Sequence, residues 1–173
     1  DIPVDHLYAS TVYIPYVKSL ALENLTIASP DVGGSKRAST YAKALDLPLV
    51  LCHKTRERAN VVSNMKIIGE VAGQNVLIID DMADTAGTLC KAANLMMENG
   101  AASVRAMVSH GVLSGKAAEN IMNSQLTELI ITDSIPFDTA KCPKVHVLTI
   151  ADMFAETTRR SYNNESISTM YLM

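Results

Sequence analysis

The stretch V-L-I-I-D-D-M-A-D-T-A-G-T-L, residues 76–89, decides the fold of this chain. Its apolar run at residues 76–79 predicts a strand buried on both faces. A short polar turn follows, and a helix is predicted over residues 85–99. In open parallel sheets, ligands bind at the carboxyl ends of the strands, where this turn stands. The stretch therefore predicts a parallel α/β sheet with a binding site at one edge.

Outward from this stretch, short Val- and Ile-rich runs alternate with longer amphipathic segments. Further strands are predicted over residues 25–29, 48–52, 104–109, 128–132 and 145–150. Further helices are predicted over residues 7–20, 35–45, 116–124 and 152–162. Residues 64–71 leave no room for a helix, so we expect them to pair antiparallel at an edge or to form an arm of the loop before them. This alternation is typical of a doubly wound α/β fold with a mostly parallel sheet and flanking helices.

The length and composition predict one globular domain over residues 1–173, because a chain of this length can bury a full hydrophobic core. The net charge of -3, without a long run of either sign, argues against a nucleic-acid-binding surface. The longest stretch free of Asp, Glu, Lys and Arg is residues 6–17, too short for a membrane helix. The three cysteines lie far apart and suggest neither disulfides nor a metal knuckle, so we expect a reducing, cytoplasmic location.

Two aspartates, Asp80 and Asp81, stand at the carboxyl end of the central predicted strand. The polar turn after them offers backbone N–H groups, hydroxyls and a helix N-terminus, which suit a phosphate. Carboxylates fit beside a phosphate when they accept hydrogen bonds from sugar hydroxyls or hold a divalent cation. The pattern predicts a site for a phosphorylated polyol such as a ribose phosphate. The alternative is that Asp84 and Thr85 only cap the helix. The turn residues of the predicted site are Asp84, Thr85, Ala86, Gly87 and Thr88.

A second turn, S-P-D-V-G-G at residues 29–34, also leads from a predicted strand into a predicted helix. Gly33 and Gly34 permit positive φ and a close approach of backbone amides to an anion. Asp31 can hold a cation that the anion also binds. Because both turns follow parallel strands, we expect them at the same edge of the sheet.

A cationic loop follows the strand at residues 48–52 and carries Lys54 and Arg56. Charge clusters of this kind are usually solvated hairpins. Beside two phosphate-binding turns, the two cations can instead close over a transferring phosphoryl group and neutralise its developing charge.

These three motifs resemble those of the ribose-phosphate pyrophosphokinase family, whose fold is that of the type I phosphoribosyltransferases. D-D-M-x-D-T-x-G-T at residues 80–88 is similar to the family's ribose-phosphate loop, S-P-D-x-G-G to its pyrophosphate loop, and K-x-R at residues 54–56 to its flexible loop. One departure is Glu57, where the family often has proline.

The resemblance implies transfer of the pyrophosphoryl group of ATP to ribose 5-phosphate, with Mg²⁺ as cofactor. It makes Lys54 and Arg56 the catalytic pair and Asp31 the metal ligand, with Asp1 and Asp5 as further metal candidates. It also implies regulation by ADP or phosphate and a homo-oligomer, a hexamer in the family. The chain would be the carboxyl-terminal half of a two-domain protein, so the isolated chain is expected to bind ribose 5-phosphate but to need the other half for turnover.

Two other functions remain open. A phosphoribosyltransferase shares the sugar-phosphate loop, but it should carry a base-binding hood, and no such insert is evident. A non-catalytic homologue would keep the fold and bind a ligand or partner. The retention of Lys54, Arg56, Asp31 and Asp81 argues against that third class, because a protein without catalysis has no chemical reason to keep all four.

Overall fold

The computed structural model describes residues 2, 4–55 and 64–171. The helical elements are α1 (Ser10–Ser19), α2 (Ser35–Leu45), α3 (Gly87–Glu98), α4 (Ala117–Asn123), η1 (Thr139–Lys141), α5 (Ala151–Tyr162) and η2 (Ser168–Tyr171). The strands are β1 (Leu25–Ser29), β2 (Leu49–Thr55), β3 (Asn64–Ile68), β4 (Asn75–Ala83), β5 (Ser103–Gly111), β6 (Glu128–Thr132) and β7 (Val145–Leu148).

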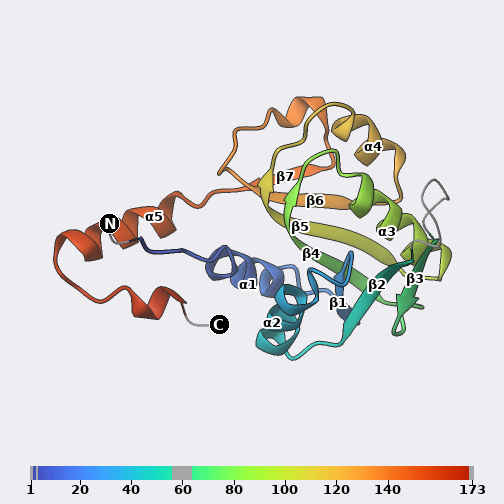
Figure 1. The fold of residues 1–173 in the computed structure, drawn as a ribbon, viewed down its shortest axis with the longest axis horizontal. Coiled ribbons are helices and arrows are strands. Elements are labelled where there is room, and N and C mark those ends of the chain that lie inside the picture. Colours follow the sequence, from blue (N-terminus) through green and yellow to red (C-terminus); the bar gives the residue numbers. More distant parts are fainter. Residues whose placement is uncertain (1, 3, 56–63, 172–173) are drawn as a thin grey trace.

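The described strands form one seven-stranded sheet in the order β3-β2-β1-β4-β5-β6-β7 (Figure 1). All neighbouring pairs are parallel except β2 and β3, which are antiparallel. The predicted parallel α/β sheet is confirmed, and so is the antiparallel edge strand. Because β1 and β4 are neighbours, the loops after these two strands open at the same edge.

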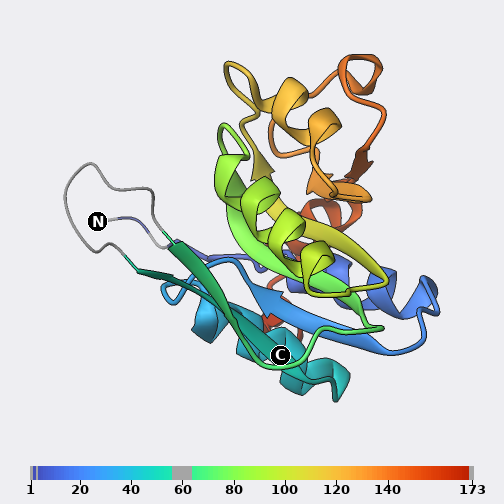
Figure 2. The ribbon, with the colours of Figure 1, turned by 90° about the vertical axis from the view of Figure 1, so that its right-hand side faces the viewer.

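Helices cover both faces of the sheet (Figure 2). Side chains of α1 and α2, among them Tyr13 and Tyr41, pack with Ile27 and Ile79 on one face. Side chains of α3 and α4 pack on the other face, where Met96 belongs to the same buried cluster as the opposite sides of the central strands. These apolar layers confirm the doubly wound arrangement, and they hold the carboxyl ends of the strands rigidly at one rim.

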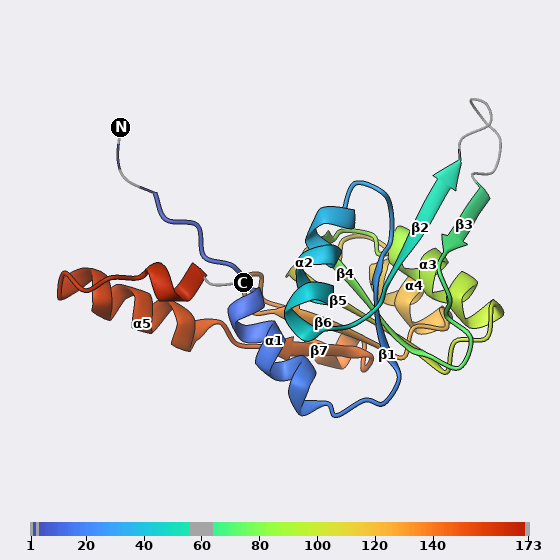
Figure 3. The same cartoon turned by 90° about the horizontal axis from the view of Figure 1, so that it is seen from below.

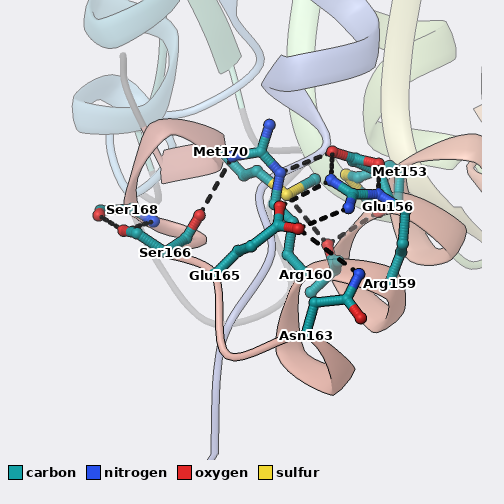
Figure 4. Close-up of polar contacts among 10 residues, drawn as sticks. Met153, Glu156, Arg159, Arg160, Asn163, Glu165, Ser166, Ser168 and Met170 are labelled. Carbon is teal, nitrogen blue, oxygen red and sulfur yellow. Dashed lines mark hydrogen bonds and ion pairs between the residues drawn. The ribbon is translucent and has the colours of Figure 1, made fainter.

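The elements α5 and η2 lie apart from the sheet, beside the N-terminal segment (Figures 1 and 3). Met153 is the buried residue of α5. Ion pairs tie Arg159 to Glu156 and Glu165, and Arg160 to Glu156 (Figure 4). Exposed ion pairs of this kind contribute little stability each.

The structure corrects two predicted boundaries near the central turn. β4 continues to Ala83, because its pairing with β5 extends to Ala83 opposite Gly111. The helix after it begins at Gly87 instead of residue 85. Asp80 and Asp81 therefore lie within the strand, and the turn itself is shorter than the sequence indicated.

Cys52, Cys90 and Cys142 are free and buried. Within the described ranges, no helix is both long enough and apolar enough to cross a membrane.

Candidate functional site

A cavity of about 200 Å³ lies at the rim where β1 and β4 end. Its lining comes from the β1–α2 turn and from the end of β4 through the start of α3. The lining residues are Asp31, Asp80, Met82, Ala83, Asp84, Thr85, Ala86, Thr88 and Leu89. The structure thus brings together the two turns that the sequence indicated, one at Asp31 and one after Asp80, although they are far apart in the chain.

A guanidinium from α2 stands beside the carboxylates of β4. Arg37 Nη1 lies 2.9 Å from Asp80 Oδ1, and Arg37 Nη2 lies 2.8 Å from Asp81 Oδ2. Burial, with a smaller contribution from the Asp81 charge, raises the pKa of Asp80 to about 6, although the Asp81 backbone N–H and Arg37 oppose the shift. One cation therefore contacts both carboxylates.

The turn from β4 into α3 is anchored by the segment that follows β5. The hydroxyl of Ser114 donates a hydrogen bond to Asp84 Oδ1, and the Ser114 N–H donates to the Asp84 carbonyl over 3.0 Å. The side chain of Asn120 donates to the Thr85 carbonyl over 2.9 Å. Ala86 has a left-handed backbone, with φ 57° and ψ 8°. These contacts hold an otherwise unfavourable conformation in place.

No side chain of the described residues caps the N-terminus of α3. The alternative that Asp84 and Thr85 serve only as helix caps is therefore wrong, since Asp84 is occupied by Ser114. The Cys90 N–H donates to the Ala86 carbonyl as the first helical hydrogen bond. The preceding N–H groups of α3 have no helical partner, and with the helix dipole they suit an anion.

The β1–α2 turn is organised by Asp31. Its Oδ1 accepts a hydrogen bond from the Gly34 N–H over 2.8 Å, and its carbonyl accepts one from the Ser29 hydroxyl over 2.7 Å. The expected use of positive φ at Gly33 and Gly34 is wrong, because neither residue has a left-handed backbone. What Gly34 provides is space: a Cβ there would lie 2.8 Å from Ser29 Oγ.

The cationic loop begins at the same rim. Lys54 lies at the carboxyl end of β2, three positions beyond Leu51, which pairs with Ser29 of β1. Arg56 lies outside the described residues, as does Asp1. Asp5 is exposed on the N-terminal segment and is not part of the cavity lining. Of the predicted metal candidates that the structure describes, Asp31 lines the cavity and Asp5 does not.

Three residues near the cavity were missed from the sequence: Arg37, Ser114 and Asn120. Arg37 lies shortly after the turn at residues 29–34, so the sequence could have indicated it as a cation beside that turn. Ser114 and Asn120 carry no local signal, because Ser114 reaches the turn from the segment after β5 and Asn120 reaches it from α4.

Three aspartates line the cavity: Asp31, Asp80 and Asp84. The described residues contain no group of three or more His, Cys, Asp or Glu that could hold a metal by themselves. Mg²⁺ commonly binds one or two carboxylates together with substrate phosphates and waters. One carboxylate at the edge of a phosphate-sized cavity is compatible with that mode.

Comparison with known proteins agrees with this geometry. Residues 55–172 match the family described as phosphoribosyl synthetase-associated domain. A ribose-phosphate pyrophosphokinase of Porphyromonas gingivalis is 54% identical over 172 residues, which cover 99% of this chain and 55% of the relative. The chain spans about half the length of the curated relatives it matches.

Solved structures show the same fold. The crystal structure of phosphoribosylpyrophosphate synthetase from Mycobacterium smegmatis has a TM-score of 0.85 and 34% identity, covering 95% of this chain and 54% of that one. Orotate phosphoribosyltransferase from Aeropyrum pernix, with a TM-score of 0.55 and 18% identity, covers 87% of this chain and 76% of its own, and it shares the fold alone. The fold is therefore that of the phosphoribosyltransferases, and the chain belongs to the phosphoribosyl synthetase-associated domain family.

Proposed function

We propose that this chain is the sugar-phosphate-binding half of a ribose-phosphate pyrophosphokinase. The reaction transfers the pyrophosphoryl group of ATP to the anomeric hydroxyl of ribose 5-phosphate and releases AMP. The observation that carries the proposal is the shared cavity, which is lined by both Asp31 and the residues 80–89 segment. The similarity to ribose-phosphate pyrophosphokinases along 99% of the chain supports the same reaction.

The 5-phosphate is assigned to the turn at the start of α3. Thr85 and Thr88 offer hydroxyls there, and the uncapped amides of α3 offer further donors. Asp80 and Asp81 are assigned to the sugar hydroxyls, which donate hydrogen bonds to carboxylates. Arg37 fixes the orientation of both carboxylates before the sugar arrives.

The pyrophosphoryl oxygens are assigned to the turn with Gly33 and Gly34, where the Asp31 carboxylate already accepts the Gly34 N–H and so organises the turn. Asp31 would hold Mg²⁺, which supplies charge neutralisation for the transferring group when bound. Lys54 and Arg56 are assigned to neutralise the charge of the transferring group, as catalytic cations in a reaction that depends mainly on positioning and electrostatics. The sugar's anomeric hydroxyl loses its proton, and its oxygen forms a bond to the β-phosphorus of ATP. The bond between the β-phosphorus and the oxygen that leaves with AMP breaks.

The proposal extends to the whole protein. Its other half would supply the adenine site, and ADP or phosphate would act as regulators of a homo-oligomer in the cytoplasm. The relatives' greater length supports the two-half organisation, since this chain covers 55% of the Porphyromonas gingivalis relative.

Binding and turnover are tested separately. Calorimetry with ribose 5-phosphate and Mg²⁺ should show binding to this chain, and Thr85→Ala should weaken it about tenfold, since a hydrogen bond to a charged group is lost. Thr40→Ala on α2 is the matched control, because Thr40 bonds only within its helix in the described contacts. The proposal fails if the unaltered chain does not bind ribose 5-phosphate.

Turnover is measured on a chimera that joins this chain to the amino-terminal half of the Porphyromonas gingivalis relative. Release of AMP from ATP that depends on ribose 5-phosphate is expected. A phosphoribosyltransferase would instead consume phosphoribosyl pyrophosphate and release pyrophosphate, so the product identifies the reaction.

A further inference from the structure

The turn between β4 and α3 contributes residues to two cavities. Thr85 and Ala86 line the cavity with Asp31 and Asp80. The next residue, Gly87, lines a second cavity of about 360 Å³ together with Asn120 of α4. The side chain of Asn120 thus approaches the turn from the side that does not line the candidate site.

Asn120 fixes one peptide unit of this turn. Its Nδ2 donates to the Thr85 carbonyl over 2.9 Å. That carbonyl and the Ala86 N–H belong to the same peptide, which is trans like all peptide bonds of the described residues. In a planar trans peptide the C=O and N–H point in opposite directions. Because α4 holds the carbonyl, the Ala86 N–H is directed away from α4 and toward the candidate site.

The turn needs such an external contact. Ala86 adopts a left-handed backbone, with φ 57°, which is unfavourable for alanine. The bonds between Ser114 and Asp84 act on the preceding residue and not on the Thr85–Ala86 peptide itself. Asn120 is the described side chain that contacts the peptide itself.

We propose that Asn120 is a positioning residue of the ribose 5-phosphate site, which holds the Thr85–Ala86 peptide so that the Ala86 N–H donates to the sugar's phosphate. The proposal rests on the proposed function and adds a residue that does not line the site. A donor oriented before binding stabilises an anion without a cost of reorganisation.

Binding measurements test the effect on the ligand. Asn120→Ala and the isosteric Asn120→Asp both remove the donor, and each should lower the affinity for ribose 5-phosphate about fivefold to tenfold. Alanine favours helix more than asparagine does, so α4 is not weakened by the first change. Asn123→Ala on the same helix, exposed and lining the same second cavity, should bind like the unaltered chain.

A measurement without ligand tests the geometry directly. The residual dipolar coupling of the Ala86 N–H reports the direction of that bond. It should change in Asn120→Ala and Asn120→Asp and stay constant in Asn123→Ala, while the melting temperature shows that each variant is folded. If Asn120→Ala does not fold, Asn120→Asp carries the same test.

The outcomes separate the two proposals. An unchanged Ala86 coupling, an unchanged affinity in the Asn120 variants, or an equal loss in Asn123→Ala overturns the positioning role. If the unaltered chain does not bind ribose 5-phosphate, the proposed function fails, while the coupling still decides whether Asn120 orients the peptide.

Discussion

The guanidinium of Arg37 donates a hydrogen bond to Asp80 over 2.9 Å and so places a cation beside a carboxylate that lines the cavity. The two residues are 43 positions apart in the chain. Arg37 also contacts Asp81 over 2.8 Å. One side chain of α2 therefore links this helix to the end of β4, and its charge opposes the rise in the pKa of Asp80 that burial causes.

Asp80→Asn should raise stability above pH 6 and not near pH 4. Burial raises the pKa of Asp80 from 3.8 to about 6, so the folded chain binds more protons than the unfolded chain between these values. Stability is therefore lost as pH rises through this window, and the cost is complete above pH 6. Asparagine cannot ionise, so the gain at pH 8 should be on the order of 1–2 kcal/mol. Thermal unfolding at pH 4.5 and pH 8 measures it.

Asp133→Asn is the control, because the pKa of Asp133 is shifted in the opposite direction to that of Asp80. Hydrogen bonds from Thr149 and from the Ile150 backbone hold the pKa of Asp133 below its ordinary value. Its ionised form contributes stability at neutral pH that is lost as pH falls through the lowered pKa. Its replacement should therefore destabilise the chain at pH 8. If Asp80→Asn raised the stability equally at pH 4.5 and pH 8, ionisation of the buried Asp80 carboxyl would not be the cause of the gain.

Arg37→Gln should raise the pKa of Asp80 above its present value of about 6, because the guanidinium lowers it. The carboxyl carbon shift of Asp80, followed by NMR against pH, measures the change. Arg105→Gln, which disrupts an ion pair with Glu128 on the sheet, is the matched control and should leave that titration unchanged. An Asp80 titration identical in both variants would show that Arg37 does not set the charge of this carboxyl.

Alanine at two glycines should have different effects. In Gly34→Ala the new Cβ would lie 2.8 Å from Ser29 Oγ, so the Asp31 turn must shift at a cost of about 1–2 kcal/mol. In Gly87→Ala the nearest atom is Thr85 Oγ1 at 3.6 Å, an ordinary contact, and helix propensity favours alanine. The second variant should therefore keep its melting temperature, because the added methyl group meets no close contact. Equal melting temperatures for both variants would refute the steric argument at Gly34.

Lys54→Ala, placed in the chimera, should lower kcat by about a hundredfold with little change in KM for ribose 5-phosphate. The physical reason is that a cation facing the transferring group acts mainly in the transition state. Lys66→Ala on β3, the adjacent antiparallel strand, is the matched control. An increase in KM with kcat unchanged would assign Lys54 to substrate binding only.

Much of the fold could be predicted because its signals are local. The strands at Leu25–Ser29 and Glu128–Thr132 and the helix at Ser35–Leu45 have the predicted bounds. Each depends on hydrophobic periodicity and end signals within about ten residues. The residues of the two turns could be chosen for the same reason, since each motif is continuous in the chain.

The errors lie where a distant partner decides the local structure. β4 extends through Asp80 and Asp81 because β5 pairs with it as far as Ala83, a contact that apolar content alone could not reveal. Gly34 is required by the Ser29 hydroxyl and not by its φ angle.

The sequence by itself determined the order of strands and helices along the chain and the two motifs predicted to bind phosphate, because periodicity, glycine and charge act over short stretches. Only the tertiary structure decided that the motifs share one cavity, that Arg37 pairs with Asp80, and that Asn120 holds the Thr85 carbonyl from 35 residues away. The physical reason is that packing of helices on a sheet brings distant polar groups within hydrogen-bond distance, and no local pattern specifies which groups will meet.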